Sequence, residues 1–146
     1  MKNSANDVRA RIACDPRVTP FRQRVYEALL EVPRGFVTTY GLLARRIGCA
    51  SAQAVGGALR ENPFAPEVPC HRVVAADLTI GGFCGSRAGA PIRRKIALLK
   101  SEGVAVNATG RVTDRRAVWT WNGTKINRIL TLRSSHLHGK RVYSCP

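Results

Sequence analysis

Residues 36–63, FVTTYGLLARRIGCASAQAVGGALRENP, carry the most informative pattern for the fold. The stretch contains two short helical segments, and each follows a hydroxyl side chain that can accept a hydrogen bond from the first helical turn. Thr38-Thr39 precedes the first segment, which runs to about residue 47 and ends at Gly48. Ser51 precedes the second, from residue 52 to about residue 61, where Asn62 before a proline disfavours further helix. Two short helices joined by a tight turn with a glycine indicate a helix-turn-helix.

An amphipathic helix is predicted before this pair. Thr19 supplies a capping hydroxyl, and Pro20 suits the first helical position because its missing N–H would be unpaired there in any case. Phe21, Val25 and Leu29 then recur at every fourth residue, which is the spacing of a core-facing stripe.

The second half of the chain alternates between short elements. Residues 68–76 are apolar and β-branched around a polar Cys-His-Arg, which indicates a short buried strand or turn, and residues 81–91 are rich in glycine and small residues, as a loop would be. A further helix is predicted from about Pro91 to Ser101, with Ile92, Ile96 and Leu99 on one face. The expected fold class is therefore α+β, mostly α, a winged-helix-like helix-turn-helix domain with a short strand pair.

Composition favours a polyanionic partner. The 146 residues include 24 basic and 9 acidic side chains, a formal net charge of +15. Charge of this size attracts nucleic acid and says little about fold. A ribosomal or nonspecifically basic protein would show the same charge, so specificity has to be argued from motifs.

The cysteines point to chemistry rather than to a scaffold. There are five of them, an odd number, and no CxxC pair occurs, which argues against a structural zinc site. No apolar run resembles a signal peptide or a membrane span. We therefore expect an intracellular protein, in the nucleus of a eukaryote or the cytoplasm of a bacterium, with no metal and no membrane association.

The run PCHRV, residues 69–73, is the most informative for function. A cysteine acts as a nucleophile only as thiolate, and a neighbouring imidazole can remove its proton. Residues adjacent in sequence do not always face each other, so Cys70 and His71 can require a bridging water, and a carboxylate that orients the imidazole would complete a relay. The alternative is a buried structural cysteine beside a surface histidine.

The run PCHRVV resembles the active-site motif of the O6-alkylguanine-DNA alkyltransferases, the methylated-DNA–protein-cysteine methyltransferases. Flanking blocks match in order: VTTYG at 37–41, AVGGALR at 54–60, Asn62-Pro63, GFCG at 82–85 and LLKSEG at 98–103. The resemblance covers roughly residues 18–112, the DNA-binding and catalytic domain of that family. It implies a domain over residues 18–113 between a polar leader, 1–17, and a basic tail of uncertain structure, 114–146.

The resemblance also implies roles. Cys70 would accept the alkyl group, His71 would act through water as its base, Glu102 would hold the imidazole, and Tyr40 would donate a proton to the leaving guanine. Gly56 and Gly57 would let the recognition helix approach the minor groove, tight helix–helix packing being the alternative reason for two helical glycines. The other DNA or substrate contacts expected are Gln53, Arg60, Asn62, Val73 through its backbone, Phe83 and Cys84.

Two positions depart from the family pattern. Gln53 stands where the family usually has an arginine that fills the gap left by a flipped base, and glutamine lacks the charge and the stacking plane. Cys84 stands where serine is common, and a thiol is a poorer hydrogen-bond donor. Gln53 therefore predicts weaker base flipping, and Cys84 predicts a weaker hydrogen bond to the extruded base.

The function expected is direct reversal of O6-alkylguanine damage in double-stranded DNA, by base flipping and irreversible transfer to Cys70 in a single turnover. We expect a monomer that needs no cofactor. The main alternative is a non-catalytic alkyltransferase-like protein that binds and flags alkylated bases, although such proteins typically lack the cysteine. A helix-turn-helix regulator would leave Cys70, His71 and Glu102 without a role, and a cysteine hydrolase has no feature that suggests an acyl substrate.

Overall fold

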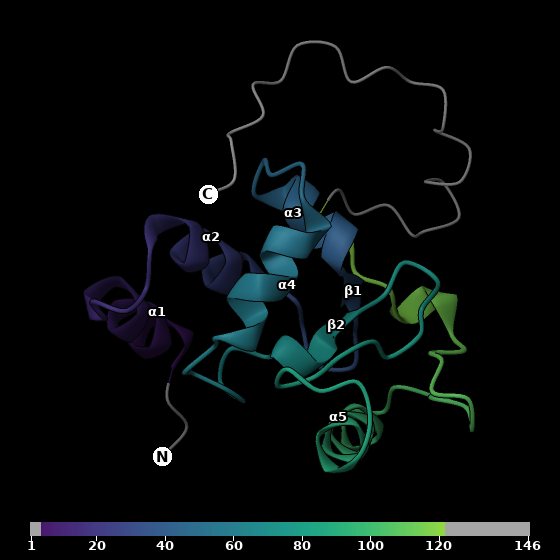
Figure 1. The fold of residues 1–146 in the computed structure, drawn as a ribbon. Coiled ribbons are helices and arrows are strands. Elements are labelled where there is room, and N and C mark those ends of the chain that lie inside the picture. The colour runs from purple at the N-terminus through teal and green to yellow at the C-terminus, as the bar shows by residue number, and fades with distance from the viewer. Residues whose placement is uncertain (1–3, 122–146) are drawn as a thin grey trace, which may run out of the picture.

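The computed structural model of the protein describes residues 4–121. Its elements are α1 (Ala5–Cys14), α2 (Pro20–Leu29), β1 (Thr38–Thr39), α3 (Tyr40–Arg46), α4 (Ala52–Arg60), β2 (Val73–Val74) and α5 (Ala90–Ser101), with 3₁₀ turns at Cys70–Arg72 and Arg115–Ala117. Figure 1 shows α4 at the centre, with α1 and α2 on one side and the β1–β2 pair and α5 on the other. The predicted class, α+β and mostly helical with a short strand pair, is confirmed.

Three helix starts lie where the hydroxyl caps predict them. Thr19 accepts a hydrogen bond from the N–H of Arg22 at 3.2 Å, and Thr39 accepts one from Leu42 at 3.1 Å. Ser51 accepts one from Ala54 at 3.0 Å, at the start of α4. Each cap satisfies a backbone donor that has no partner inside its helix.

The helix-turn-helix consists of α3 and α4, which pack against each other and against α2. Gly48 adopts a φ of +70° in the connecting turn, a conformation that residues with a Cβ rarely adopt. Tyr26 of α2 is fully buried and donates its hydroxyl hydrogen to the carbonyl of Ala58 in α4 at 2.8 Å. This bond attaches the buried face of the predicted recognition helix to α2, so α4 has a defined orientation.

The N-terminal segment is more than a polar leader. Ser4 caps α1, and Val8 and Ile12 of that helix are 3% and 1% exposed within the main hydrophobic cluster. Two apolar residues four positions apart form too narrow a stripe to stand out in a polar sequence. The packed region therefore begins near residue 4 rather than at residue 18.

The packed region also continues past residue 113. Val37 donates its N–H to the carbonyl of Ala117 at 2.8 Å, and Trp119 donates to the carbonyl of Val37 at 2.6 Å. Val118 is buried in the second hydrophobic cluster. The part of the expected tail from residue 114 to residue 121 thus belongs to the domain, while the remainder, with His136, His138 and Cys145, lies outside the described residues.

The strand pair joins the two halves of the site. β1 and β2 are parallel, with Thr38 opposite Val73 and Thr39 opposite Val74. Tyr40 follows β1 directly and opens α3, whereas the turn Cys70–Arg72 leads directly into β2. Pairing of two short segments more than thirty residues apart therefore brings the start of α3 beside the cysteine-bearing turn.

Candidate active site

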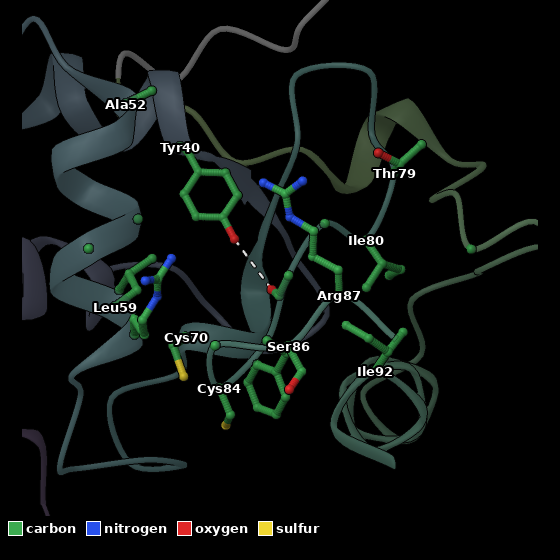
Figure 2. Close-up of a pocket in the computed structure, with 18 of the residues that line it drawn as sticks. Tyr40, Ala52, Leu59, Cys70, Thr79, Ile80, Cys84, Ser86, Arg87 and Ile92 are labelled. Carbon is green, nitrogen blue, oxygen red and sulfur yellow. Dashed lines mark hydrogen bonds between the residues drawn. The ribbon is translucent and has the colours of Figure 1, made fainter. Parts of the chain in front are cut away.

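An open pocket of about 920 Å³ lies between α4 and the loop that precedes α5. Of the residues singled out from the sequence, those that line it are Tyr40, Gln53, Gly56, Gly57, Arg60, Cys70, Phe83 and Cys84. Figure 2 shows Tyr40 and Leu59 on the helical side, Ile80, Ser86 and Arg87 on the loop side, and Cys70 and Cys84 together at one end. The structure thus gathers most of the predicted residues around one cavity.

Cys70 is 8% exposed and lies in the 3₁₀ turn at one end of the pocket. Burial raises the pKa of its thiol, and a side-chain hydrogen bond with Asn62 opposes that rise. A buried thiol remains protonated at neutral pH, so a base must remove its proton before it can attack an electrophile.

His71 and Glu102 form the predicted imidazole–carboxylate pair behind Cys70. The distance from His71 Nε2 to Glu102 Oε1 is 2.9 Å, and the two side chains are 3% and 9% exposed. Burial lowers the pKa of His71, which keeps the ring neutral at pH 7. Because an ionised carboxylate can only accept hydrogen bonds, the ring must carry its proton on Nε2.

The other ring nitrogen of His71 is then a free base. His71 Nδ1 is buried and has no hydrogen-bond partner among residues 4–121. In the tautomer that Glu102 selects, Nδ1 holds a lone pair and can accept a proton from the Cys70 thiol, directly or through a water molecule. The geometry therefore supplies the imidazole–carboxylate pair of the relay that the sequence indicates, with Nδ1 left unpaired among the described residues.

Arg72 is a member of this network that motif reasoning did not single out. Its Nε and Nη2 donate to the two oxygens of Glu102 at 2.9 and 2.8 Å, and Nη1 donates to the carbonyl of Val32 at 2.8 Å. Burial raises the pKa of Glu102, but the hydrogen bonds from Arg72 and His71 outweigh it and lower the pKa to about 2. Arg72 thus holds the carboxylate both ionised and in place.

Asn62 connects the helix-turn-helix to the cysteine turn. It donates through Nδ2 to the carbonyl of Val68 at 3.0 Å and accepts from the N–H of Phe64 at 2.9 Å. The same side chain forms a hydrogen bond with the Cys70 thiol, so Asn62 connects the end of α4 to the cysteine. Asn62 does not itself line the pocket.

Val73 differs from the prediction. Its side chain is fully buried, it does not line the pocket, and its carbonyl accepts a hydrogen bond from Lys95 Nζ at 2.6 Å. The backbone group expected to face a bound base is therefore already engaged by a buried lysine. The sequence contains one signal for this contact. Lys95 is a charged residue on the apolar face of α5, three residues after Ile92 and four before Leu99.

The exposed face of α4 offers a smooth surface beside the pocket. Gln53, Gly57 and Arg60 are exposed at positions i, i+4 and i+7, opposite the buried Val55 and Leu59. A Cβ at Gly57 would meet no atom within 4 Å, so tight packing inside the domain is not the reason for that glycine.

Gly81 has a different role from the glycines of α4. Its φ is +67°, and a Cβ there would meet the Tyr40 ring at 3.7 Å. Tyr40 in turn donates its hydroxyl hydrogen to the carbonyl of Gly82 at the long distance of 3.5 Å (Figure 2). The loop thus approaches the tyrosine closely at a position whose backbone favours glycine.

The described residues thus combine a helix-turn-helix with a pocket beside its second helix, a buried cysteine in that pocket, and a histidine–glutamate pair that begins at the next residue. Residues 20–104 match the family model described as 6-O-methylguanine DNA methyltransferase, DNA binding domain. The chain belongs to this family.

Curated relatives are similar over the same region. The methylated-DNA–protein-cysteine methyltransferase of Mycobacterium tuberculosis is 45% identical over 92 residues, which are 62% of this chain and 53% of that protein. The protein of the same name from Thermococcus kodakarensis is 49% identical over 88 residues, 60% of this chain and 47% of that protein. The chain thus spans about half the length of the curated relatives it matches.

Solved structures agree on the fold. The M. tuberculosis OGT in complex with DNA aligns with a TM-score of 0.53 at 46% identity, covering 60% of this chain and 52% of that one. S. pombe Atl1, in complex with damaged DNA containing O6-carboxymethylguanine, aligns with a TM-score of 0.61 at 31% identity, covering 68% of this chain and 94% of that one.

Proposed function

We propose that this chain repairs double-stranded DNA by taking an alkyl group from the O6 of guanine onto Cys70. The observation that carries the proposal is a buried, protonated thiol in a pocket beside α4. His71 follows it in the chain, and the hydrogen bond from His71 Nε2 to Glu102 leaves Nδ1 of the ring as a free base. Similarity to methyltransferases of methylated DNA supports the same chemistry. The reaction takes place where the DNA is, in the nucleus or the bacterial cytoplasm.

In the proposed reaction, His71 Nδ1 takes the thiol proton through a water molecule. The resulting thiolate attacks the alkyl carbon, so that an S–C bond forms while the C–O6 bond breaks. The electron pair of the broken bond stays with the guanine, and Tyr40 donates a proton to that leaving base. The thioether on Cys70 has no reducing or hydrolytic partner in the proposal, so one protein molecule repairs one base.

Access to the pocket requires base flipping. The alkyl group of a stacked guanine cannot reach the sulfur of Cys70, a residue that is 8% exposed, so the base must leave the duplex, at a free-energy cost of a few kcal/mol. Arg60 and Arg87 line the pocket and can bind the phosphates on either side of it. Gly57 adds no side chain where α4 would enter the minor groove. The proposed reaction needs no metal, cofactor or second subunit, since every reacting group named here belongs to this chain.

Among the helices within residues 4–121, none combines the length and apolarity that a membrane span requires. Within the same residues, no group of three or more His, Cys, Asp or Glu side chains is arranged to hold a metal ion.

Mass spectrometry tests the proposal directly. Protein mixed with duplex DNA carrying one O6-methylguanine is expected to gain one methyl group, on the peptide that contains Cys70, and to saturate at one per molecule. Cys84→Ser is the matched control, because it removes the other thiol of the pocket and should leave the labelling of Cys70 in place. No gain, combined with tighter binding to damaged than to undamaged DNA, would instead establish the lesion-flagging function.

Gln53→Arg should accelerate repair of duplex DNA. Arginine adds a charge and a stacking plane on the exposed face of α4, where it can fill the gap left by the flipped base. A contact worth about 0.5–1 kcal/mol would raise the single-turnover rate roughly 2- to 5-fold. Ala50→Arg, which adds the same charge in the turn before α4, is the control.

The free base O6-methylguanine needs no extrusion and serves as a second substrate for the Gln53→Arg experiment. We expect the Gln53→Arg and original proteins to react with it at equal rates. Equal acceleration on duplex and free base would show that residue 53 acts on something other than base flipping.

A further inference from the structure

Cys84 is a second thiol in the pocket, and the relay of Cys70, His71 and Glu102 does not use it. Among the cysteines of residues 4–121, Cys70 and Cys84 are the two that line the cavity, and both are free thiols in this structure. Cys84 is exposed, whereas Cys70 is 8% exposed. A small reactive molecule that arrives from solvent therefore meets Cys84 first.

The backbone around Cys84 does not account for a cysteine at this position. Phe83 and Ser86 exchange two hydrogen bonds, with N–O distances of 2.8 and 2.9 Å, so that Cys84 and Gly85 form the tip of a tight turn. Their φ angles are +49° and +77°, a combination that favours asparagine, aspartate or glycine. The turn would form more readily with one of those residues, so the thiol of Cys84 is the feature to explain.

Both cysteines lie against the end of α4. A Cβ at Gly85 would lie 3.7 Å from Arg60 Cγ, so the tip of the turn packs against the last residue of that helix. Asn62, two residues further along the chain, forms a hydrogen bond with the Cys70 thiol. Figure 2 shows the sulfur atoms of Cys70 and Cys84 at the same end of the pocket. The fold thus brings together two thiols from separate segments.

The charge of one thiol acts on the other. Burial raises the pKa of the Cys70 thiol, and a negative charge on Cys84 raises it further. An effect of this kind between like charges requires that the two groups lie near each other. Cys84 and Gly85 are both exposed, so the tip of the turn can shift toward Cys70 without uncovering the core.

We propose that Cys70 and Cys84 form a reversible disulfide when a peroxide oxidises the pocket, and that this bond switches alkyl transfer off. The consequence rests on the transfer function proposed above, because the bond occupies the sulfur that would accept the alkyl group. The modification goes beyond that function, since it gives a single-use cysteine a recoverable state. A dithiol reduces a disulfide by exchange, whereas it does not cleave a thioether.

The chemistry needs a peroxide as oxidant and groups that the chain already holds. The Cys84 thiol attacks one oxygen of hydrogen peroxide, the O–O bond breaks, and the products are a sulfenic acid on Cys84 and one water molecule. The Cys70 sulfur then attacks the Cys84 sulfur, so that an S–S bond forms while the S–O bond breaks. The departing hydroxide takes the proton that His71 Nδ1 removes from Cys70, which gives a second water molecule. The two thiols lose two electrons in total, and these electrons reduce the peroxide.

Peptide mapping of the full chain in the absence of DNA tests the bond. Trypsin cleaves after Arg60, Arg72 and Arg87, so Cys70 lies in peptide 61–72 and Cys84 in peptide 73–87. After brief treatment with hydrogen peroxide and quenching with N-ethylmaleimide in acid, we expect these two peptides to be joined, with the loss of two hydrogen atoms. Dithiothreitol should separate them again.

The activity of the same samples tests the consequence. The loss of methyl acceptance from O6-methylguanine DNA should equal the fraction of molecules that carry the bond, and dithiothreitol should restore it. In Cys84→Ser, the Cys70 sulfur has no partner thiol in the pocket and should proceed to the sulfinic and sulfonic acids, which dithiothreitol does not reduce. Each protein is compared with its own untreated sample. Cys14→Ser removes an exposed thiol of α1 outside the pocket and, as the matched control, should behave as the original protein does.

Peptides 61–72 and 73–87 that stay separate at every peroxide concentration would overturn the proposal. A bond between the Cys84 residues of two molecules, in place of the internal one, would overturn it as well, and non-reducing electrophoresis shows which of the two has formed. Equal recovery of Cys84→Ser and the original protein would show that Cys84 does not protect Cys70 and would also count against the switch.

The mapping experiment does not depend on DNA repair. If the original protein transfers no methyl group from DNA but the two peptides still become joined, the proposed transfer function fails and the disulfide stands. If the original protein transfers methyl groups and the peptides do not become joined, the disulfide fails and the transfer function stands.

Discussion

A Cys70→Ala protein is expected to acquire no methyl group from O6-methylguanine DNA while binding that DNA as tightly as the original protein. In the proposed reaction the Cys70 sulfur forms the new bond to the alkyl carbon, so its loss should remove the reaction. Binding should persist because Cys70 is 8% exposed and contributes little of the surface that contacts DNA. Mass spectrometry measures the first effect, and fluorescence anisotropy with labelled duplex measures the second.

Cys84 is the residue that could contradict this expectation. It lines the same pocket and is an exposed free thiol. However, the partner of the carboxylate-bound imidazole is expected to be Cys70, the residue next to His71, and Asn62 acts on Cys70 as well. We therefore expect no transfer to Cys84 in Cys70→Ala. A methyl group found on the peptide that contains Cys84 would show that the pocket has a second acceptor and that activation does not depend on the His71 relay.

Glu102→Gln is expected to give the second largest effect, through the tautomer of His71. The carboxylate accepts one hydrogen bond from His71 and two from Arg72. A glutamine has only one carbonyl oxygen, and if that oxygen keeps Arg72, the amide N–H₂ faces His71 Nε2. The imidazole then accepts on Nε2 and carries its proton on Nδ1, where the free base is needed. Loss of general-base catalysis should slow methyl transfer by about 10²–10⁴-fold.

The same substitution should lower the free energy of unfolding. Glu102 and Arg72 have side chains 9% and 15% exposed, so loss of the carboxylate leaves a largely buried guanidinium without its charge partner. Such a loss typically destabilises a protein by roughly 3–5 kcal/mol. Urea denaturation measures it. Glu31→Gln is the control, because Glu31 pairs with Arg46 at the surface, where a broken ion pair changes stability by only about 0.2–1 kcal/mol.

The pH dependence of stability checks the Glu102 contribution independently. The folded-state pKa of Glu102 is lowered to about 2, from 4.5. A group whose pKa is lowered by folding stabilises the folded state fully above its unfolded pKa and loses that contribution as pH falls through the folded pKa. The difference in unfolding free energy between the original protein and Glu102→Gln should therefore be constant above about pH 5 and shrink between pH 4.5 and pH 2. A difference that does not change over this interval would contradict the role of Arg72 and His71 in holding the ionised carboxylate.

The sequence alone predicted the elements whose signals are local. Thr19, Thr39 and Ser51 each form the cap expected of them, because a capping hydroxyl reaches a backbone N–H only three residues away. The glycine turn at Gly48 and the proline after Asn62 end their helices for reasons that also lie within one or two residues. The cysteine motif and its flanking blocks indicated the family in the same way, since the order of the blocks is itself a property of the chain.

The edges of the domain required tertiary structure. Helix α1 has only Val8 and Ile12 to mark its buried side, and the segment near Val118 contributes single bridges rather than a periodic strand. Both segments are held by partners distant in sequence, Val118 by Val37 and α1 by α2. A polar or irregular segment that packs through a few such contacts has no local pattern from which its packing could be predicted.

From the sequence alone came the residues of the proposed reaction: a cysteine, its histidine, and a glutamate to orient that histidine, on a helix-turn-helix. How those groups are held is visible only in the folded structure. Arg72 reaches Glu102 across 30 positions, and Lys95 reaches Val73 across 22. The physical reason is that a buried positive charge is tolerated only where the folded chain supplies hydrogen-bond acceptors for it. Here the acceptors are backbone carbonyls and a carboxylate, and no local sequence pattern indicates where they lie.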